Sequence, residues 1–321
     1  MKSIRILTIA LLAVMAAAGV ASAQTYPERP VTFIVPFGAG GGTDIIARTV
    51  SEDLTKALGK SIIVDPRPGA NGAIGSTVVA RAVPDGYTLL FTGSSTYSLN
   101  PNLMKEITYD QLKDLVPVAM IGRSPWMLTV PTDSPFKTVA DVIAYGKANP
   151  GKLVFPFWQS SVLVSGEMFG QVTGIQMRKV PYKGQTEVTT DFIAGRLPVY
   201  FCDIPGARPQ IEAGKMRILA TMTAKRTGLY PNVPTMREEG VDIVTDSMLA
   251  VFAPAGTPKP ILERLNAEIS KIVDTSQSVR ERLTQIGIDP SPMNLADADA
   301  FVRTELSRWA DMISKAGLQK Q

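Results

Sequence analysis

Short apolar runs alternate with longer amphipathic stretches along the first part of the chain. The runs at 31–35, 61–65 and 87–92 are rich in branched and aromatic residues, which is typical of buried strands. Amphipathic stretches at about 43–58 and 71–82 lie between them and are predicted to be helices. This alternation favours a parallel sheet, so the predicted fold class is α/β.

The same alternation continues through the middle of the chain. Thr138, with Asp141 three residues later, has the residue types that begin a helix. The predicted strands are 126–130, 153–157, 197–202 and 216–222, and the predicted helices are about 139–148, 185–193 and about 206–213. A second α/β lobe is therefore expected here.

Two long amphipathic patterns, Pro258–Thr275 and Ala296–Ala316, form the C-terminal part, and Gly317 is placed to cap the second. A chain of 321 residues with 45% hydrophobic composition is longer than a single hydrophobic core usually accommodates, which favours two lobes. The expected division assigns 24–122 and 222–321 to the first lobe and 123–221 to the second.

The N-terminus has the pattern of a secretory signal peptide over residues 1–23. Lys2 and Arg5 precede an apolar run, and Ala21-Ser22-Ala23 is a small-residue cleavage signature. No cysteine lies near the cleavage point, and no later stretch approaches the ~20 apolar residues of a membrane-spanning helix. The mature protein is expected to be soluble in the periplasm.

Charge and composition exclude several functions. The formal net charge is +4, and two of the basic residues belong to the signal peptide, so we expect no nucleic-acid partner. The chain has no histidine, which excludes histidine-based catalysis and histidine-ligated metals. The single cysteine, Cys202, follows apolar residues and is expected to be a buried thiol. No cofactor or metal is predicted.

A glycine-rich loop, Pro36–Asp44, joins the first strand to the first helix. Backbone N–H groups at such a junction suit an anion, either a carboxylate or a phosphate. Thr43 stands where a dinucleotide fingerprint needs glycine, and no Lys-Ser/Thr pair follows, so nucleotides are disfavoured. The alternative is a turn that serves only close packing. Gly41 is expected to allow close ligand approach and a positive φ.

Other candidates have two interpretations each. Asp44 is either an ordinary acid in the first turn of a helix or a group that shapes the glycine loop. Lys183 is either a surface lysine or a source of positive potential beside a helix start. Trp158 is either core or pocket wall. The Ser134-x-x-Lys137 spacing resembles an acyl-transfer motif but lacks its partner motifs.

Several stretches together resemble one family. They are Tyr26–Pro30, Pro36–Asp44, Arg67–Gly72, Pro84–Leu90, Val180–Gly184, Gly214–Arg217, Val233–Thr235 and Ala253–Pro258. Over the full mature length, their order is similar to that in the tripartite tricarboxylate transporter substrate-binding proteins, the Bug family of bacterial periplasmic receptors. The resemblance implies a type II periplasmic-binding-protein fold, in which two α/β lobes close on a small ligand held in the cleft between them.

The resemblance also implies a function. Family members bind small carboxylates, such as di- and tricarboxylates or acidic amino acids, and deliver them to a membrane permease with one large and one small subunit. They are not enzymes, and a monomer is expected. Two alternatives stay open: a sensory receptor that presents its ligand to a membrane kinase, and an exported enzyme acting on a carboxylated compound. The sequence does not identify the carboxylate.

Site residues are implied by the same resemblance. The first-lobe contacts are Phe37, Gly38, Ala39, Gly40, Gly41 and Asp44, with Ser94, Ser95 and Thr96. The second-lobe contacts are Trp158, Gln159, Ser160, Ser161, Tyr182, Lys183, Gly184 and Asp203. Many relatives have a small polar loop where this chain has Trp158, so a bulkier and more apolar pocket is expected.

Overall fold

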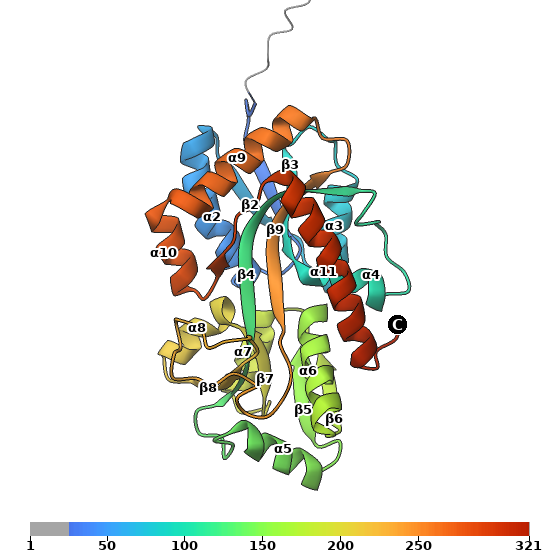
Figure 1. Ribbon diagram of the computed structural model, residues 1–321, viewed down its shortest axis with the longest axis vertical. Coiled ribbons are helices and arrows are strands. Elements are labelled where there is room, and N and C mark those ends of the chain that lie inside the picture. The colour runs from blue at the N-terminus through green and yellow to red at the C-terminus, as the bar shows by residue number, and fades with distance from the viewer. Residues whose placement is uncertain (1–25, 321) are drawn as a thin grey trace, which may run out of the picture.

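The computed structural model describes residues 26–320 and shows a two-lobed α/β protein, as expected (Figure 1). The predicted signal peptide at 1–23 lies outside the described residues. In the first lobe, β1 pairs in parallel with β2 and β3. Its early elements are β1 (Val31–Val35), α2 (Gly42–Leu58), β2 (Ile62–Pro66), η1 (Ala70–Gly72), α3 (Ala73–Ala80), β3 (Thr88–Gly93), η2 (Ser95–Leu99) and α4 (Asn100–Leu103). The C-terminal elements are α9 (Lys259–Thr275), α10 (Gln277–Gln285), β10 (Asp289–Pro290) and α11 (Leu295–Lys315).

The second lobe contains most of the middle of the chain. Its parallel pair β5–β6 is a separate two-stranded sheet, whereas β7 and β8 pair with β4. Thr138 and Asp141 form the expected capping box at the start of α5. The elements are α5 (Val139–Ala148), β5 (Leu153–Phe157), α6 (Ser160–Thr173), β6 (Met177–Pro181), α7 (Gln185–Ile193), β7 (Tyr200–Asp203), α8 (Ile204–Glu212) and β8 (Met216–Thr221).

Two long strands, β4 (Leu115–Pro131) and β9 (Asp246–Pro254), connect the lobes (Figure 1). They pair with each other, and β9 also pairs with β3 of the first lobe. The prediction of a strand over 126–130 was too short, because β4 begins at Leu115. The predicted helix at 71–82 begins only at Ala73, because Asn71 and Gly72 have positive φ.

Three hydrophobic clusters form the core. Two of them cover the two faces of the first-lobe sheet, and the third fills the second lobe. Helix α11 contributes to both lobes, since Ala298 and Val302 pack in the first lobe, whereas Trp309 and Met312 pack with the second-lobe cluster. Cys202 is fully buried in that cluster, as expected, and burial raises the pKa of its thiol.

Candidate functional site

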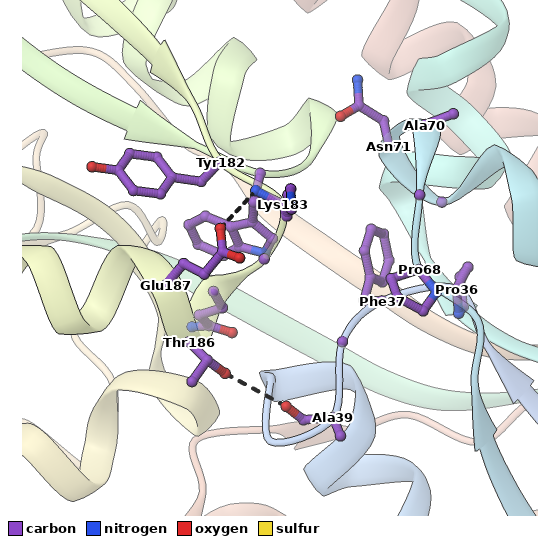
Figure 2. A pocket seen from close by; sticks show the side chains of 16 residues that line it. Pro36, Phe37, Ala39, Pro68, Ala70, Asn71, Tyr182, Lys183, Thr186 and Glu187 are labelled. Atoms are coloured by element: carbon purple, nitrogen blue, oxygen red, sulfur yellow. Dashed lines mark hydrogen bonds between the residues drawn. The ribbon is translucent and has the colours of Figure 1, made fainter.

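A cavity of about 680 Å³ lies between the lobes (Figure 2). Four loops form it, and each follows the carboxyl end of a strand in a parallel pair, β1 with β2 and β5 with β6. This is where open α/β sheets bind ligands. The loops contribute Pro36–Ala39, Pro68–Gly72, Trp158 and Tyr182–Glu187.

The predicted site residues that line this cavity are Phe37, Gly38, Ala39, Trp158, Tyr182, Lys183 and Gly184. Sequence reasoning interpreted Pro68–Gly72 as a rigid turn and did not assign it to the site, and it also missed Gln185, Thr186 and Glu187. The parallel pairing of β1 and β2 places the loop after β2 beside the glycine loop. A predicted parallel pairing of these two strands could therefore have assigned Pro68–Gly72 to the site.

Trp158 belongs to both the core and the cavity wall. Its side chain is only 5% exposed, and its ring makes edge contacts with Trp126 and Tyr200 at centroid distances of 6.5 and 5.6 Å. It also lines the cavity, together with Phe37. Both interpretations of Trp158 therefore hold, and the cavity has a large aromatic wall.

The charged residues of the cavity wall lie on the second lobe. Lys183 and Glu187 line it, and the backbone N–H of Lys183 donates to the Glu187 carboxylate at 3.2 Å. The hydroxyl of Tyr182 donates to Asp191 at 2.8 Å. Helix α7 begins immediately after Gly184, and no side chain caps its first turn. Free N–H groups and a lysine thus meet at one end of the cavity.

Asp44 shapes the glycine loop and also lies in the first turn of α2. Its carboxylate accepts hydrogen bonds from the Gly40 N–H and from Arg48, both at 3.0 Å. Gly40 has a φ of 76°, which requires glycine-like freedom. The expectation of a positive φ at Gly41 is wrong, because its φ is −77°. The tight turn is made one residue earlier.

The start of α2 contacts the second lobe. The N–H of Gly42 donates to Gln185 Oε1 at 3.0 Å, and Gln185 Nε2 donates to Asp203 Oδ1 at 2.6 Å. Asp203 is buried, which raises its pKa, although hydrogen bonds from Gln185 and Gly206 act in the opposite direction. A Cβ on Gly42 would overlap the Asp203 carboxylate. The two lobes therefore touch closely here.

Predicted site residues also meet behind the cavity. Ser95 Oγ lies 2.6 Å from Ser161 Oγ, accepts from the Ser161 N–H at 3.1 Å and donates to Gln159 Oε1 at 3.2 Å. Ser160 Oγ donates to Asn100 Oδ1 at 2.6 Å. We call this set of contacts across the lobes the interlobe seam; it consists of Gly42, Ser95, Asn100, Gln159, Ser160, Ser161, Gln185 and Asp203.

Ser94 and Thr96 are buried within the first lobe. The Ser94 hydroxyl accepts from the Met248 N–H at 2.9 Å, and Thr96 is hydrogen-bonded to Thr92 at 2.7 Å. Neither residue lines the large cavity. Their contacts hold β3, β9 and the turn after β3 together.

The family model for the tripartite tricarboxylate transporter family receptor matches residues 46–318. The chain belongs to this family. It is 35% identical over 310 residues to the protein BugT of Bordetella pertussis, an alignment that covers 94% of this chain and 95% of the relative. The family consists of periplasmic solute-binding receptors, in agreement with the resemblance noted from the sequence.

Two solved structures of receptors with bound acids are similar to this chain. R. palustris Rpa4515 with adipate has a TM-score of 0.89 and 33% identity, covering 92% of this chain and all of that one (100%). MatC (Rpa3494) from Rhodopseudomonas palustris with bound malate has a TM-score of 0.83 and 29% identity, with coverage of 90% and 100%. None of the helices between residues 26 and 320 combines the length and apolar character that a bilayer-crossing segment needs.

Proposed function

We propose that this receptor captures a small organic acid in the cavity between its lobes and presents it to a membrane permease with a large and a small subunit. The observation that carries the proposal is a cavity of about 680 Å³ formed by strand-end loops of both lobes. The acids bound by the similar structures, adipate and malate, are of the size and chemistry that such a cavity accepts.

One carboxylate of the ligand would lie at the start of α7. The uncapped first turn of that helix supplies N–H donors there, and the exposed Lys183 ammonium adds a water-screened positive potential that offsets the nearby Glu187 carboxylate. Charge-assisted hydrogen bonds of this kind are each worth roughly 1.5 to 3 kcal/mol. The apolar body would pack against Phe37 and Trp158.

The remaining predicted site residues would act through closure. We assign Gln159, Ser160, Ser161 and Asp203 to holding the lobes together around the ligand, and Gly40, Gly41 and Asp44 to shaping the first-lobe loop. The proposed lobes are 24–122 with 222–321, and 123–221. The packing of the end of α11 on the second-lobe core supports contact between them.

A binding role rather than catalysis is part of the proposal. The one serine–lysine spacing in the sequence does not form an activated pair, because Lys137 Nζ donates to the Ser134 carbonyl oxygen at 2.8 Å. We also propose that the mature chain is a periplasmic monomer. Incubation with a bound acid, followed by mass spectrometry, is expected to return the acid unchanged.

A thermal-shift screen tests the function. The acids are succinate, malate, adipate, citrate, benzoate and terephthalate, with hexanoate as a monoacid matched to adipate. A ligand that binds only the native state stabilises it by about 2.7 kcal/mol at a 100-fold excess over Kd. At least one acid should raise the melting temperature in a saturable way. No shift with any of them would contradict the proposal.

A further inference from the structure

We propose that Asn71 recognises the second polar end of the ligand, and that Asn100 and Ser160 are positioning residues that hold it in place only when the lobes close. This inference rests on the proposed function and deepens it. None of these three residues forms the carboxylate end of the site at α7, so the site would have two polar ends across an apolar middle.

Asn71 lies in an unusual turn on the rim of the cavity. Ala70 and Asn71 have φ values of 46° and 51°, and both line the cavity wall. A left-handed conformation is uncommon outside glycine, and it persists only when neighbouring contacts hold it. One such contact is a hydrogen bond of 2.9 Å from Asn100 Nδ2 to the Asn71 carbonyl oxygen.

The orientation of Asn100 depends on the other lobe. Asn100 and Ser160 are fully buried, and the Ser160 hydroxyl donates to Asn100 Oδ1 at 2.6 Å. Because the Asn71 carbonyl oxygen needs a donor, the amide nitrogen of Asn100 must face it, and the amide oxygen must then face Ser160. Ser160 begins α6 of the second lobe, so this hydrogen-bond relay is complete only in the closed arrangement.

The Asn71 carboxamide is available to a ligand. Its side chain forms no hydrogen bond with any residue between 26 and 320, and it lines the cavity. Figure 2 shows it across the cavity from Tyr182 and Lys183. A neutral amide offers one donor group and one acceptor, so it suits a second carboxylate or a hydroxyl. The geometry thus favours acids with polar groups at both ends.

The first test replaces Asn71 with glycine. Asn71→Gly removes the carboxamide while keeping a residue that tolerates the positive φ, so the turn is retained. Calorimetry with adipate and hexanoate, which differ in one carboxyl group, measures the effect. We expect adipate affinity to fall about tenfold, as for the loss of one hydrogen bond to a charged group, and hexanoate affinity to change less than twofold.

The second test concerns the positioning residues. Ser160→Ala should reproduce the adipate-specific loss in part, about fivefold. Ser165→Ala is the matched control, because Ser165 is an equally buried serine of α6 whose hydroxyl meets Thr245 at 3.3 Å. This control should leave the ratio of adipate to hexanoate affinity unchanged. In the double variant Asn71→Gly/Ser160→Ala, the ratio of adipate to hexanoate affinity should change no more than in Asn71→Gly alone.

Equal losses for both acids in Asn71→Gly, or the same change in affinity ratio for Ser160→Ala and Ser165→Ala, would overturn this inference while leaving the receptor function intact. A wild-type protein that binds none of the acids would instead overturn the proposed function itself.

Discussion

The cavity and the interlobe seam lie next to each other but differ in character. The cavity is about 680 Å³, with walls dominated by Phe37, Trp158 and prolines. Along the seam, polar side chains are buried and hydrogen-bonded across the lobes, and the voids there are only about 10 Å³ each. The seam therefore determines how the lobes meet, whereas the cavity determines which molecule fits between them.

This difference has an energetic basis. A buried polar group without a partner costs about 1 to 3 kcal/mol, so the seam is stable either fully closed or open to water. The polar side chains of the cavity lie on two sides, Asn71 on the first lobe and Tyr182–Glu187 on the second, so its affinity depends on shape and on the groups at these two ends. Substitutions in each region test whether the cavity and the seam can be separated experimentally.

Substitutions of Trp158 should affect both stability and ligand choice, because its ring belongs to both the hydrophobic core and the cavity wall. Trp158→Ala should lower the free energy of unfolding by roughly 3 to 5 kcal/mol. Trp158→Phe should keep the fold but change the ranking of benzoate and terephthalate against succinate and adipate, measured by calorimetry with fluorescence during titration. An unchanged ranking and no fluorescence response would remove Trp158 from the cavity wall.

Gly42 tests the seam alone. In Gly42→Ala, the new methyl group would overlap the Asp203 carboxylate, which Gln185 and Gly206 hold by hydrogen bonds, so closure must either displace this carboxylate or leave the lobes apart. Ligand affinity should fall on the order of 100-fold, because few molecules remain competent to close. Gly228→Ala is the control, since Gly228 is exposed, does not line the cavity, and its Cβ would have no heavy atom within 4 Å.

Small-angle scattering provides the second measurement for this pair. Gly42→Ala should stay expanded at ligand concentrations that compact the wild type and Gly228→Ala. Compaction of Gly42→Ala to the wild-type dimensions would show that closure does not need the contact between Gly42 and Asp203.

The strands that connect the lobes provide a contrast with the seam. Asp246 of β9 pairs with Arg123 of β4 at 2.6 Å and with Arg308 of α11 at 3.1 Å. Burial raises the pKa of Asp246, but the two arginines outweigh it, and the pKa lies below 3.8. Asp246→Asn should cost roughly 2 kcal/mol of stability at neutral pH, because the partly buried Arg123 and Arg308 then keep only Glu305 as a charged partner.

The pH dependence of this pair follows from the lowered pKa. The stability that the Asp246 charge contributes is fully present above pH 3.8 and is lost as the pH falls through its lower folded-state pKa. Urea titrations of wild type and Asp246→Asn should therefore converge in strongly acidic buffer. If the difference in unfolding free energy between the two proteins stays constant in strongly acidic buffer, the destabilisation by Asp246→Asn comes from packing and not from the lost charge.

Lys183 should give the smallest effect. It is exposed on the cavity rim, so its attraction for a carboxylate is screened by water and salt. Lys183→Ala should weaken binding of the carboxylates only about threefold at low ionic strength, and the difference should vanish in about 0.5 M salt, well above physiological strength. A salt-independent loss would mean that Lys183 contacts the ligand directly in a dry site.

Much of the fold was predictable because local patterns specify it. The strand at 31–35 and the helices at 139–148 and 185–193 have the bounds that their sequences indicate. Helix α6 was missed because it is buried on nearly every side and has no amphipathic period. The part of β4 before Trp126 contains Pro117 and Pro125, which normally argue against a strand.

The site was predictable only in part. The loops after β1, β5 and β6 could be assigned because strand ends in α/β folds form ligand sites. The pairings of the seam could not be predicted, although Ser95, Gln159, Ser160, Ser161 and Asp203 were expected in the site. They depend on contacts such as Gly42 with Gln185, which are 143 residues apart in the chain. No local pattern encodes which buried serine or amide meets which partner across the lobes.

The decisive measurement is a crystal structure of the protein with the acid that stabilises it most strongly. We expect density for the acid between Phe37 and Trp158, with one carboxylate at the start of α7 and the contacts of the seam intact. An acid bound outside this cavity, or a closed protein that leaves the cavity empty at saturating acid, would contradict it.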